Sequence, residues 1–249
     1  PPANFGFPQD VENTNAFLTL LSGFVSVADW IGSMEDYFPL GDFQALATDY
    51  AITSRQQARI AIRELAWRLQ APLTKPATFE TLFPFSMNAI QETVVKLSEK
   101  WQEPSLLILE APTGIGKTEA AFYIADSWLQ QSQGRGIYIA MPTMATSNQM
   151  FSRTKNFLQK RFPQDVIQIH LANGQARFKE DFKEILLNSV YTEDSNENQG
   201  HIIAGHWFLP RKRTLLAPFG VGTVDQTLMS VLQTRHFFVR LFGLAKKII

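Results

Sequence analysis

The sequence predicts an α/β fold, with a parallel sheet covered by helices on both faces, preceded by an all-α segment. Hydrophobic residues make up 45% of the 249 residues and charged residues 18%, a composition typical of a packed core. From Phe79 onward, short apolar runs alternate with stretches of helical periodicity, which is typical of parallel sheets. Before Phe79 the apolar residues recur at helical spacing only.

The all-α segment contains two expected helices. Residues 11–33 predict a buried helix and residues 53–69 a second one, because apolar residues recur at helical spacing in both. A short polar run with two prolines follows at 71–77, and such runs are typical of domain boundaries. We therefore expect two domains, at 1–75 and 76–249.

The second segment predicts alternating strands and helices. Strands are expected at 106–110, 136–141 and 166–171, and helices at 117–131, 147–160 and 222–234. Leu215 and Leu216 are candidates for a strand, 192–198 is expected to be a surface loop, and 245–249 is expected to begin another strand.

Composition and the chain ends set further expectations. The 23 Lys and Arg residues balance the 23 Asp and Glu residues, so net charge gives no indication of a nucleic-acid partner. The absence of cysteine excludes disulfides and thiolate metal sites and fits a cytoplasmic location. The most apolar stretch, 16–31, contains four polar residues, so we expect no membrane span. The chain starts with Pro1-Pro2 and ends at an apparent strand, which predicts a fragment of a longer protein.

The strongest motif is a glycine-rich turn between a predicted strand and a predicted helix. It reads Ala111-Pro112-Thr113-Gly114-Ile115-Gly116-Lys117-Thr118. Glycines let backbone N–H groups approach phosphate oxygens, and the helix N-terminus adds positive charge. Lys117 would reach the β- and γ-phosphates of ATP, and the Thr118 hydroxyl would hold Mg²⁺. A chance glycine-rich turn is the alternative interpretation.

Three further motifs fit a nucleic-acid motor, each with a simpler alternative. Gln91 precedes the loop, where its amide would read the N6 and N7 edge of adenine, or it is a solvated helix residue. Pro142 and Thr143 end a predicted strand and would contact a DNA backbone, or they form an ordinary turn. Gly222 and Thr223 precede a helix N-terminus that could donate to DNA phosphates, whereas Asp225 could simply cap that helix.

The first predicted helix carries a line of polar residues. Ser22, Ser26, Asp29 and Ser33 lie at spacings of four, three and four. A carboxylate inside an apolar helix needs a partner. A metal ion, an arginine or a set of N–H donors would each supply one.

In combination these motifs resemble the CRISPR-associated helicase–nuclease of type I systems. The segment 26–33 is similar to the last metal-binding helix of its HD nuclease domain. The phosphate loop with Glu119-Ala120-Ala121, Met141-Pro142-Thr143 and the stretch 215–226 follow in the order of that family. The resemblance covers nearly the whole chain. It implies the end of an HD domain followed by the first RecA-like lobe of a superfamily 2 helicase.

The resemblance also implies an activity and partners. In that family the HD domain cuts single-stranded DNA with divalent transition metals (Mn, Ni, Co or Fe), and two RecA-like lobes pull the strand 3′ to 5′ with ATP and Mg²⁺. A surveillance complex with a guide RNA recruits the enzyme. By resemblance, Asp29 is a metal ligand with Ser33 beside it. The nucleotide residues are Gln91, Thr113, Gly114, Ile115, Gly116, Lys117, Thr118 and Glu119, and the DNA residues are Pro142, Thr143, Gly222 and Thr223.

The sequence departs from the family in three respects. No histidine precedes the predicted boundary, no Asp-Glu dipeptide occurs, and no second RecA-like lobe is present. We therefore expect the 249-residue chain to bind ATP weakly without turning it over or cutting DNA. Two alternatives remain: a superfamily 2 translocase of repair or restriction without nuclease activity, and a non-enzymatic adaptor that binds nucleotide as a switch.

Overall fold

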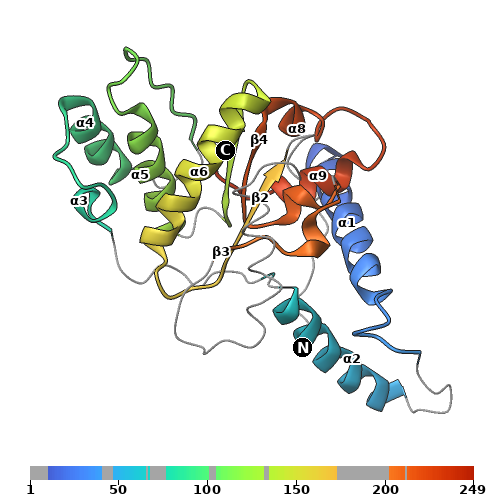
Figure 1. Ribbon diagram of the computed structural model, residues 1–249. Helices are drawn as coiled ribbons and strands as arrows, with labels where there is room; N and C mark the ends of the chain where they lie inside the picture. Colours follow the sequence, from blue (N-terminus) through green and yellow to red (C-terminus); the bar gives the residue numbers. More distant parts are fainter. Residues whose placement is uncertain are drawn as a thin grey trace.

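A parallel sheet forms the centre of the computed structural model (Figure 1). The structure describes residues 11–40, 47–65, 67, 77–100, 105–131, 135–172, 202–210 and 212–249. Its strands run in the order β1-β4-β2-β3, and every pair is parallel. They are β1 (Ile137–Met141), β2 (Ile167–Ala172), β3 (Ile202–Ile203) and β4 (Phe219–Thr223). This arrangement confirms the predicted α/β fold.

Alternate residues of each strand point to opposite sides of the sheet, and helices cover both sides. On one face, Ile137, Ile169 and Val221 join a core with α3 (Phe79–Leu82), α5 (Lys117–Gln130) and α6 (Met144–Arg161). On the other face, Tyr138 and Ala172 pack against the 3₁₀ turn η4 (Thr214–Leu216) and α9 (Phe237–Leu244). The α/β part also contains α4 (Ala89–Ser98), the 3₁₀ turn η3 (His206–Phe208) and α8 (Val224–Leu228).

Strand β4 lies in the middle of the sheet, where the sequence predicted the start of a helix. Glycine is required at position 222 because atoms of the two neighbouring strands lie too close for a side chain. A Cβ added at Gly222 would lie 2.3 Å from the Tyr138 hydroxyl and 2.5 Å from the carbonyl oxygen of Ala172. Glycine is unfavourable in strands in general, but here it makes room for a neighbouring ring. The helix expected at 222–234 therefore starts late, as α8, and is short.

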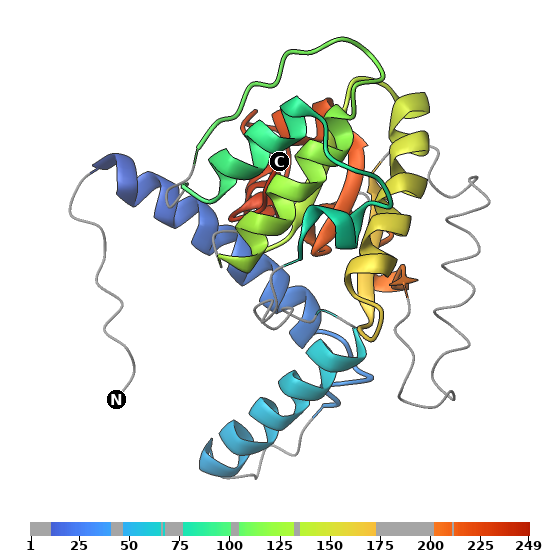
Figure 2. The ribbon, with the colours of Figure 1, turned by 90° about the vertical axis from the view of Figure 1, so that its left-hand side faces the viewer.

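The N-terminal helices pack onto the α/β part. Helix α1 (Val11–Gly32) lies beside α9 (Figures 1 and 2). The contact is close, because a Cβ added at Gly23 would lie 2.5 Å from the Cβ of Phe242. Helix α2 (Ala47–Glu64) joins the same core through Ala61. The predicted boundary run at 71–76 lies outside the described residues, and the segments on its two sides share this core.

A cation–π contact adds to this packing. The Arg213 guanidinium lies 5.7 Å from the ring centroid of Trp30 in α1 and 5.0 Å from that of Trp207 in η3. Cations over indole rings are held by the ring quadrupole. Arg213 therefore connects α1 to the α/β part of the chain.

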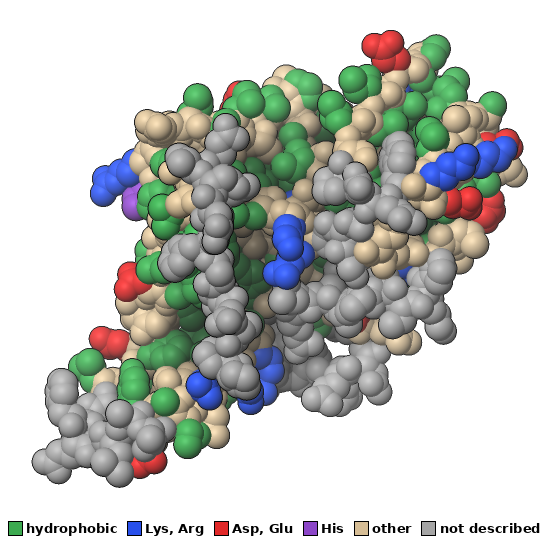
Figure 3. Space-filling view, turned by 180° about the vertical axis from the view of Figure 1, so that it is seen from behind, with side chains coloured by type: hydrophobic (Ala, Val, Ile, Leu, Met, Phe, Trp, Pro, Cys, Tyr) green, Lys and Arg blue, Asp and Glu red, His purple; other side chains and the backbone are tan. Residues whose placement is uncertain are grey.

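The segment Thr14–Gly32 of α1 is long and apolar enough to cross a membrane by length and composition, although we expected no span here. Such a helix is weak evidence, since core helices of other proteins have the same character. The prediction that this helix is buried was wrong, because several of its apolar side chains are exposed, among them Leu21, Phe24 and Val25. On the face drawn in Figure 3, apolar side chains cover much of the described surface, and the Lys and Arg side chains are scattered and form no continuous patch.

The predicted strand at 106–110 was wrong. The segment pairs with no strand in the described part of the chain, although its side chains do alternate. Leu107 and Leu109 pack against α4 and α5, whereas Leu106 and Ile108 are 87% and 73% exposed. Alternation shows that one face is covered, but a strand also needs a neighbour for its N–H and C=O groups.

Other bounds differ for local reasons. The predicted strand at Leu215 and Leu216 is a 3₁₀ turn. Helix α6 starts three residues earlier than expected, because Thr143 caps it. Helix α2 begins and ends earlier than the predicted 53–69. At the chain end, Ile248 forms one parallel bridge to Ile137. The predicted loop at 192–198 lies outside the described residues.

Candidate nucleotide site

The glycine-rich loop turns into α5 through two left-handed residues. Gly114 has φ 86° and Gly116 has φ 79°, a region that side chains with a Cβ rarely adopt. A Cβ added at Gly116 would also lie 2.3 Å from the Nε2 atom of Gln91. Gly116 caps α5 without any side-chain hydrogen bond to the helix. Both glycines are thus needed for the shape of the turn.

The backbone amides of the loop are available to a ligand. Within the described ranges, no protein group accepts a hydrogen bond from the N–H of Thr113, Gly114 or Ile115. Pro112, Thr113 and Gly114 are exposed. Successive N–H groups in such a turn, next to a helix N-terminus, form a concave site that suits an anion.

Lys117 lies against the same loop. Its Nζ atom donates to the carbonyl oxygens of Ala111 and Pro112, the latter at 2.8 Å. Both partners are neutral carbonyl groups of the loop, so neither offsets the positive charge of Lys117 beside the exposed amides. A phosphate there would meet this charge together with the N–H groups and the α5 N-terminus.

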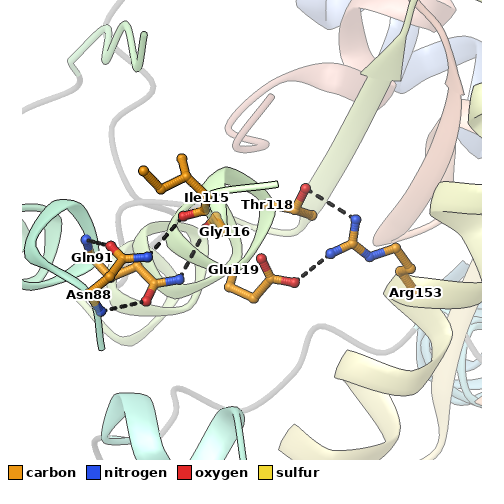
Figure 4. A network of polar contacts seen from close by, with 7 residues as sticks. All are labelled: Asn88, Gln91, Ile115, Gly116, Thr118, Glu119 and Arg153. Carbon is orange, nitrogen blue, oxygen red and sulfur yellow. Dashed lines mark hydrogen bonds and ion pairs between the residues drawn. The ribbon is translucent and has the colours of Figure 1, made fainter. Parts of the chain in front are cut away.

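The N-terminus of α4 braces the loop (Figure 4). Asn88 caps α4, and its Nδ2 atom donates to the Ile115 carbonyl at 2.9 Å. Gln91 completes the capping box: its Oε1 atom accepts from the Asn88 amide at 3.0 Å, and its Nε2 atom donates to the Gly116 carbonyl at 3.2 Å. Gln91 is only 2% exposed. Both ends of the amide predicted to bind adenine are therefore used by the chain in this structure.

The opposite side of the loop contacts α6. The Arg153 guanidinium donates from Nη1 to the Thr118 hydroxyl at 3.3 Å and forms an ion pair with Glu119 through Nη2 (Figure 4). Sequence reasoning did not identify Arg153, Asn88 or their contacts. Asn88 could have been found from the Asn-x-x-Gln spacing that is typical of a capping box. No sequence signal marks Arg153, which lies 35 residues after Thr118.

The two predicted DNA motifs lie side by side at the carboxyl edge of the sheet. Met141 is paired with Thr223 and Ala140 with Gly222, so Pro142 and Thr143 follow directly beside them. Thr143 caps α6, with its Oγ1 atom accepting from the Thr146 amide at 3.2 Å. Pro142 and Thr143 are exposed, whereas Gly222 and Thr223 are buried. The N-cap of α8 is Thr223, so the capping alternative for Asp225 was wrong.

The predicted metal ligand lies on α1, which packs on α9, whereas α5 covers the other face of the sheet. Asp29 and Ser33 are both exposed, and the Ser33 hydroxyl donates to the Asp29 carbonyl at 2.8 Å. Among the described residues, no group of three His, Cys, Asp or Glu side chains could hold a metal ion. The structure therefore gives Asp29 no companion ligand, and its role stays a prediction.

Two family models match the chain. The model described as DEAD/DEAH box helicase matches residues 88–202, which include the phosphate loop and Met141-Pro142-Thr143. The model described as Cas3, HD domain matches residues 2–38, which include α1. The second match disfavours the alternative of a translocase without a nuclease domain. It also assigns the apolar helix α1 to that HD domain.

Relatives and solved structures agree with both models. The chain is 39% identical over 227 residues to the CRISPR-associated endonuclease/helicase Cas3 of Thermus thermophilus, covering 90% of this chain and 24% of that protein. It superposes on T. fusca Cas3-AMPPNP with a TM-score of 0.74 and 33% identity, covering 92% of this chain and 25% of that one. The chain spans about a quarter of the length of these relatives.

A third match comes from an assembly. A chain of a CRISPR RNA-guided surveillance complex, pre-nicking, superposes with a TM-score of 0.52 and 28% identity, covering 92% of this chain and 20% of that one. This chain thus matches a helicase model and a Cas3 HD-domain model, and it aligns over about nine-tenths of its length with Cas3 proteins. The chain belongs to the Cas3 helicase–nuclease family.

Proposed function

We propose that residues 111–118 bind Mg·ATP, and that the chain is the first RecA-like lobe of a helicase that moves along DNA. The observation that carries this proposal is the turn itself. Its two left-handed glycines, its unbonded amides and Lys117 all lie at the N-terminus of α5. This combination binds the terminal phosphates of a nucleotide in P-loop proteins. The superposition on T. fusca Cas3-AMPPNP supports it.

The roles of the site residues are part of the proposal. Lys117 would contact the β- and γ-phosphates, the Thr118 hydroxyl would complete the coordination of Mg²⁺, and the amides of Thr113 to Gly116 would bind phosphate oxygens. Gln91 would contact adenine only after releasing Asn88 or Gly116, since its amide bonds both in this structure. Glu119 would hold Arg153, with which it forms an ion pair.

The DNA side would lie at the carboxyl edge of the sheet. Pro142 and Thr143 are exposed there beside the buried Gly222 and Thr223, so a single strand would touch the first pair directly. Backbone N–H groups and hydroxyls position a strand without reading its bases. A sequence-independent contact of this kind suits an enzyme that moves along DNA.

The nuclease activity and the partners are proposed for the whole protein. Asp29 would bind a transition metal (Mn, Ni, Co or Fe) in the HD domain, whose further ligands lie outside the described residues. Single-stranded DNA would be the substrate, and a guide-RNA surveillance complex of a type I system would recruit the enzyme. The match to a surveillance-complex chain supports this partner. The relatives come from bacteria, and we place this protein in the cytoplasm.

The variant Asp29→Ala tests whether the two activities are separate. In the intact gene product it should abolish Mn²⁺-dependent nicking of single-stranded DNA, because a carboxylate ligand is lost, while DNA-stimulated ATP hydrolysis continues. Nicking is measured on circular single-stranded DNA, and ATPase by phosphate release. Ser22→Ala on the same helix is the control, because its hydroxyl donates only to the Leu18 carbonyl. Unchanged nicking by Asp29→Ala would favour a translocase in which α1 is purely structural.

A further inference from the structure

Arg153 reaches the phosphate loop from a different element. It lies on α6, outside every motif discussed above, and its guanidinium touches both Thr118 and Glu119 in the first turn of α5 (Figure 4). About half of its side chain is exposed. A planar guanidinium can donate to two neighbouring oxygens at once, and here one belongs to a hydroxyl and the other to a carboxylate.

The contact is not required to hold α5 and α6 together. Farther along the two helices, the rings of Phe122 and Phe157 stack at 4.6 Å between centroids with planes 7° apart. Beyond them, Arg161 of α6 forms a buried ion pair with Asp126 of α5. Stacked rings and a buried pair contribute more to packing than a half-exposed ion pair does. The effect of Arg153 is therefore expected at the loop.

The Thr118 hydroxyl has two competing partners. It accepts a hydrogen bond from Arg153 in this structure, and the proposed function gives the same oxygen to Mg²⁺. A guanidinium and a divalent cation on one oxygen repel each other strongly, because Coulomb repulsion rises as the distance falls. Lys117 adds a further positive charge beside them. Mg²⁺ and Arg153 are thus not expected on Thr118 together.

We propose that Arg153 is a positioning residue that holds the Thr118 hydroxyl in the nucleotide-free chain and releases it when Mg·nucleotide binds. Glu119 keeps the guanidinium beside the site through both states, since its carboxylate pairs with the second nitrogen. This rests on the proposed nucleotide site. Because Thr143 caps the N-terminus of α6, the same helix also borders the proposed DNA side.

The test measures how much Mg²⁺ contributes to the affinity for the nucleotide. Affinity for ADP is measured on the 249-residue chain by isothermal titration calorimetry, once with Mg²⁺ and once with EDTA, and the ratio of the two dissociation constants gives the benefit of the metal. Arg153→Gln removes the competitor for Thr118, so this benefit should rise about threefold, as expected for a half-exposed pair. Lys160→Ala, which removes an exposed cation from the same helix, should leave the benefit unchanged.

A double-variant cycle assigns the effect to the hydroxyl. In a Thr118→Ala background, Arg153→Gln should change the metal benefit no further, because the contested oxygen is already absent. Arg153→Lys should give a rise smaller than Arg153→Gln, since an ammonium keeps the charge but cannot bond both oxygens in the same fork.

Three results would overturn the inference. They are an unchanged or smaller metal benefit in Arg153→Gln, an equal rise in Lys160→Ala, or the same rise in the Thr118→Ala background. Two other results would contradict the nucleotide site itself. They are the absence of ADP binding to the wild-type chain, or ADP binding that is unchanged in Lys117→Ala. The two failures are therefore distinguishable.

Discussion

Lys117→Ala is expected to weaken Mg·ATP binding by the chain about 10- to 100-fold, the value of a charge-assisted hydrogen bond to phosphate. In the intact protein the same change should abolish DNA-stimulated ATP hydrolysis, because the ammonium stabilises charge that develops on the transferred phosphoryl group. Binding is measured by titration calorimetry and hydrolysis by phosphate release.

Two controls accompany this prediction. Lys160→Ala removes an exposed ammonium from α6 and should leave both values unchanged. Lys117→Arg should also be inactive, because a planar guanidinium spreads its charge over a fork and does not place the compact charge of the Lys117 ammonium beside the loop. Wild-type affinity in Lys117→Ala would exclude the loop as the phosphate site. Turnover near one per second in the wild-type 249-residue chain would contradict the expectation that one lobe alone does not hydrolyse ATP.

Asp126→Ala is expected to lower the free energy of unfolding by about 3–5 kcal/mol, the usual loss when one partner of a buried ion pair is removed. Asp126 is 1% exposed, and its Oδ1 atom lies 2.5 Å from the Nε atom of Arg161. Gln130 donates to the other carboxylate oxygen. Without the carboxylate, the Arg161 cation stays largely buried between α5 and α6. Urea unfolding followed by circular dichroism measures the loss.

The variant Asp126→Asn tests the charge alone, and its effect depends on pH. Burial raises the pKa of Asp126 above its ordinary value of 3.8, although Arg161 and Gln130 oppose the shift. The folded chain therefore binds this proton more tightly than the unfolded chain does, so the free energy of unfolding falls as pH rises through the window just above 3.8. Asp126→Asn should remove this fall in the free energy of unfolding with rising pH.

For Asp126→Ala, a loss of unfolding free energy below about 1 kcal/mol would contradict a stabilising buried ion pair between Asp126 and Arg161.

Much of the fold follows from periodicity. Residues 11–33, 136–141 and 166–171 were predicted as elements and are found as α1, β1 and β2. Short-range patterning therefore predicted the type of these elements, but in α1 the buried side chains are Val27 and Ile31, whereas Leu21 and Phe24 of the predicted apolar stripe are exposed. The glycine-rich turn at 111–118 was also predicted from sequence, and both Gly114 and Gly116 adopt the left-handed conformation that favours glycine.

The failures come from long-range contacts. Strand β4 was not predicted, and the helix expected at 222–234 overlapped its last two residues. The Tyr138 ring of the neighbouring strand and the Ala172 carbonyl explain why glycine occurs at position 222. The segment at 106–110 has a strand pattern but no neighbouring strand in the described part of the chain. Patterns report which face is covered, and they do not report which partner supplies hydrogen bonds.

The site was predicted only where its residues are contiguous. Lys117 and Thr118 belong to one motif, whereas Arg153 is brought to Thr118 by the packing of α6 on α5. Gln91 was predicted from its position to read adenine, which stays a prediction, and its hydrogen bond to Gly116 was not predicted. Contacts of this kind between distant segments leave no mark in a single sequence.

The most direct test of the phosphate site uses the backbone amides themselves. Mg·ADP is added to the isotope-labelled 249-residue chain, and amide chemical shifts are followed by NMR. The largest changes are predicted at Thr113, Gly114, Ile115 and Gly116, whose N–H groups would bind the phosphate oxygens. If these resonances stay in place while the nucleotide binds and shifts others, the loop is not the phosphate site.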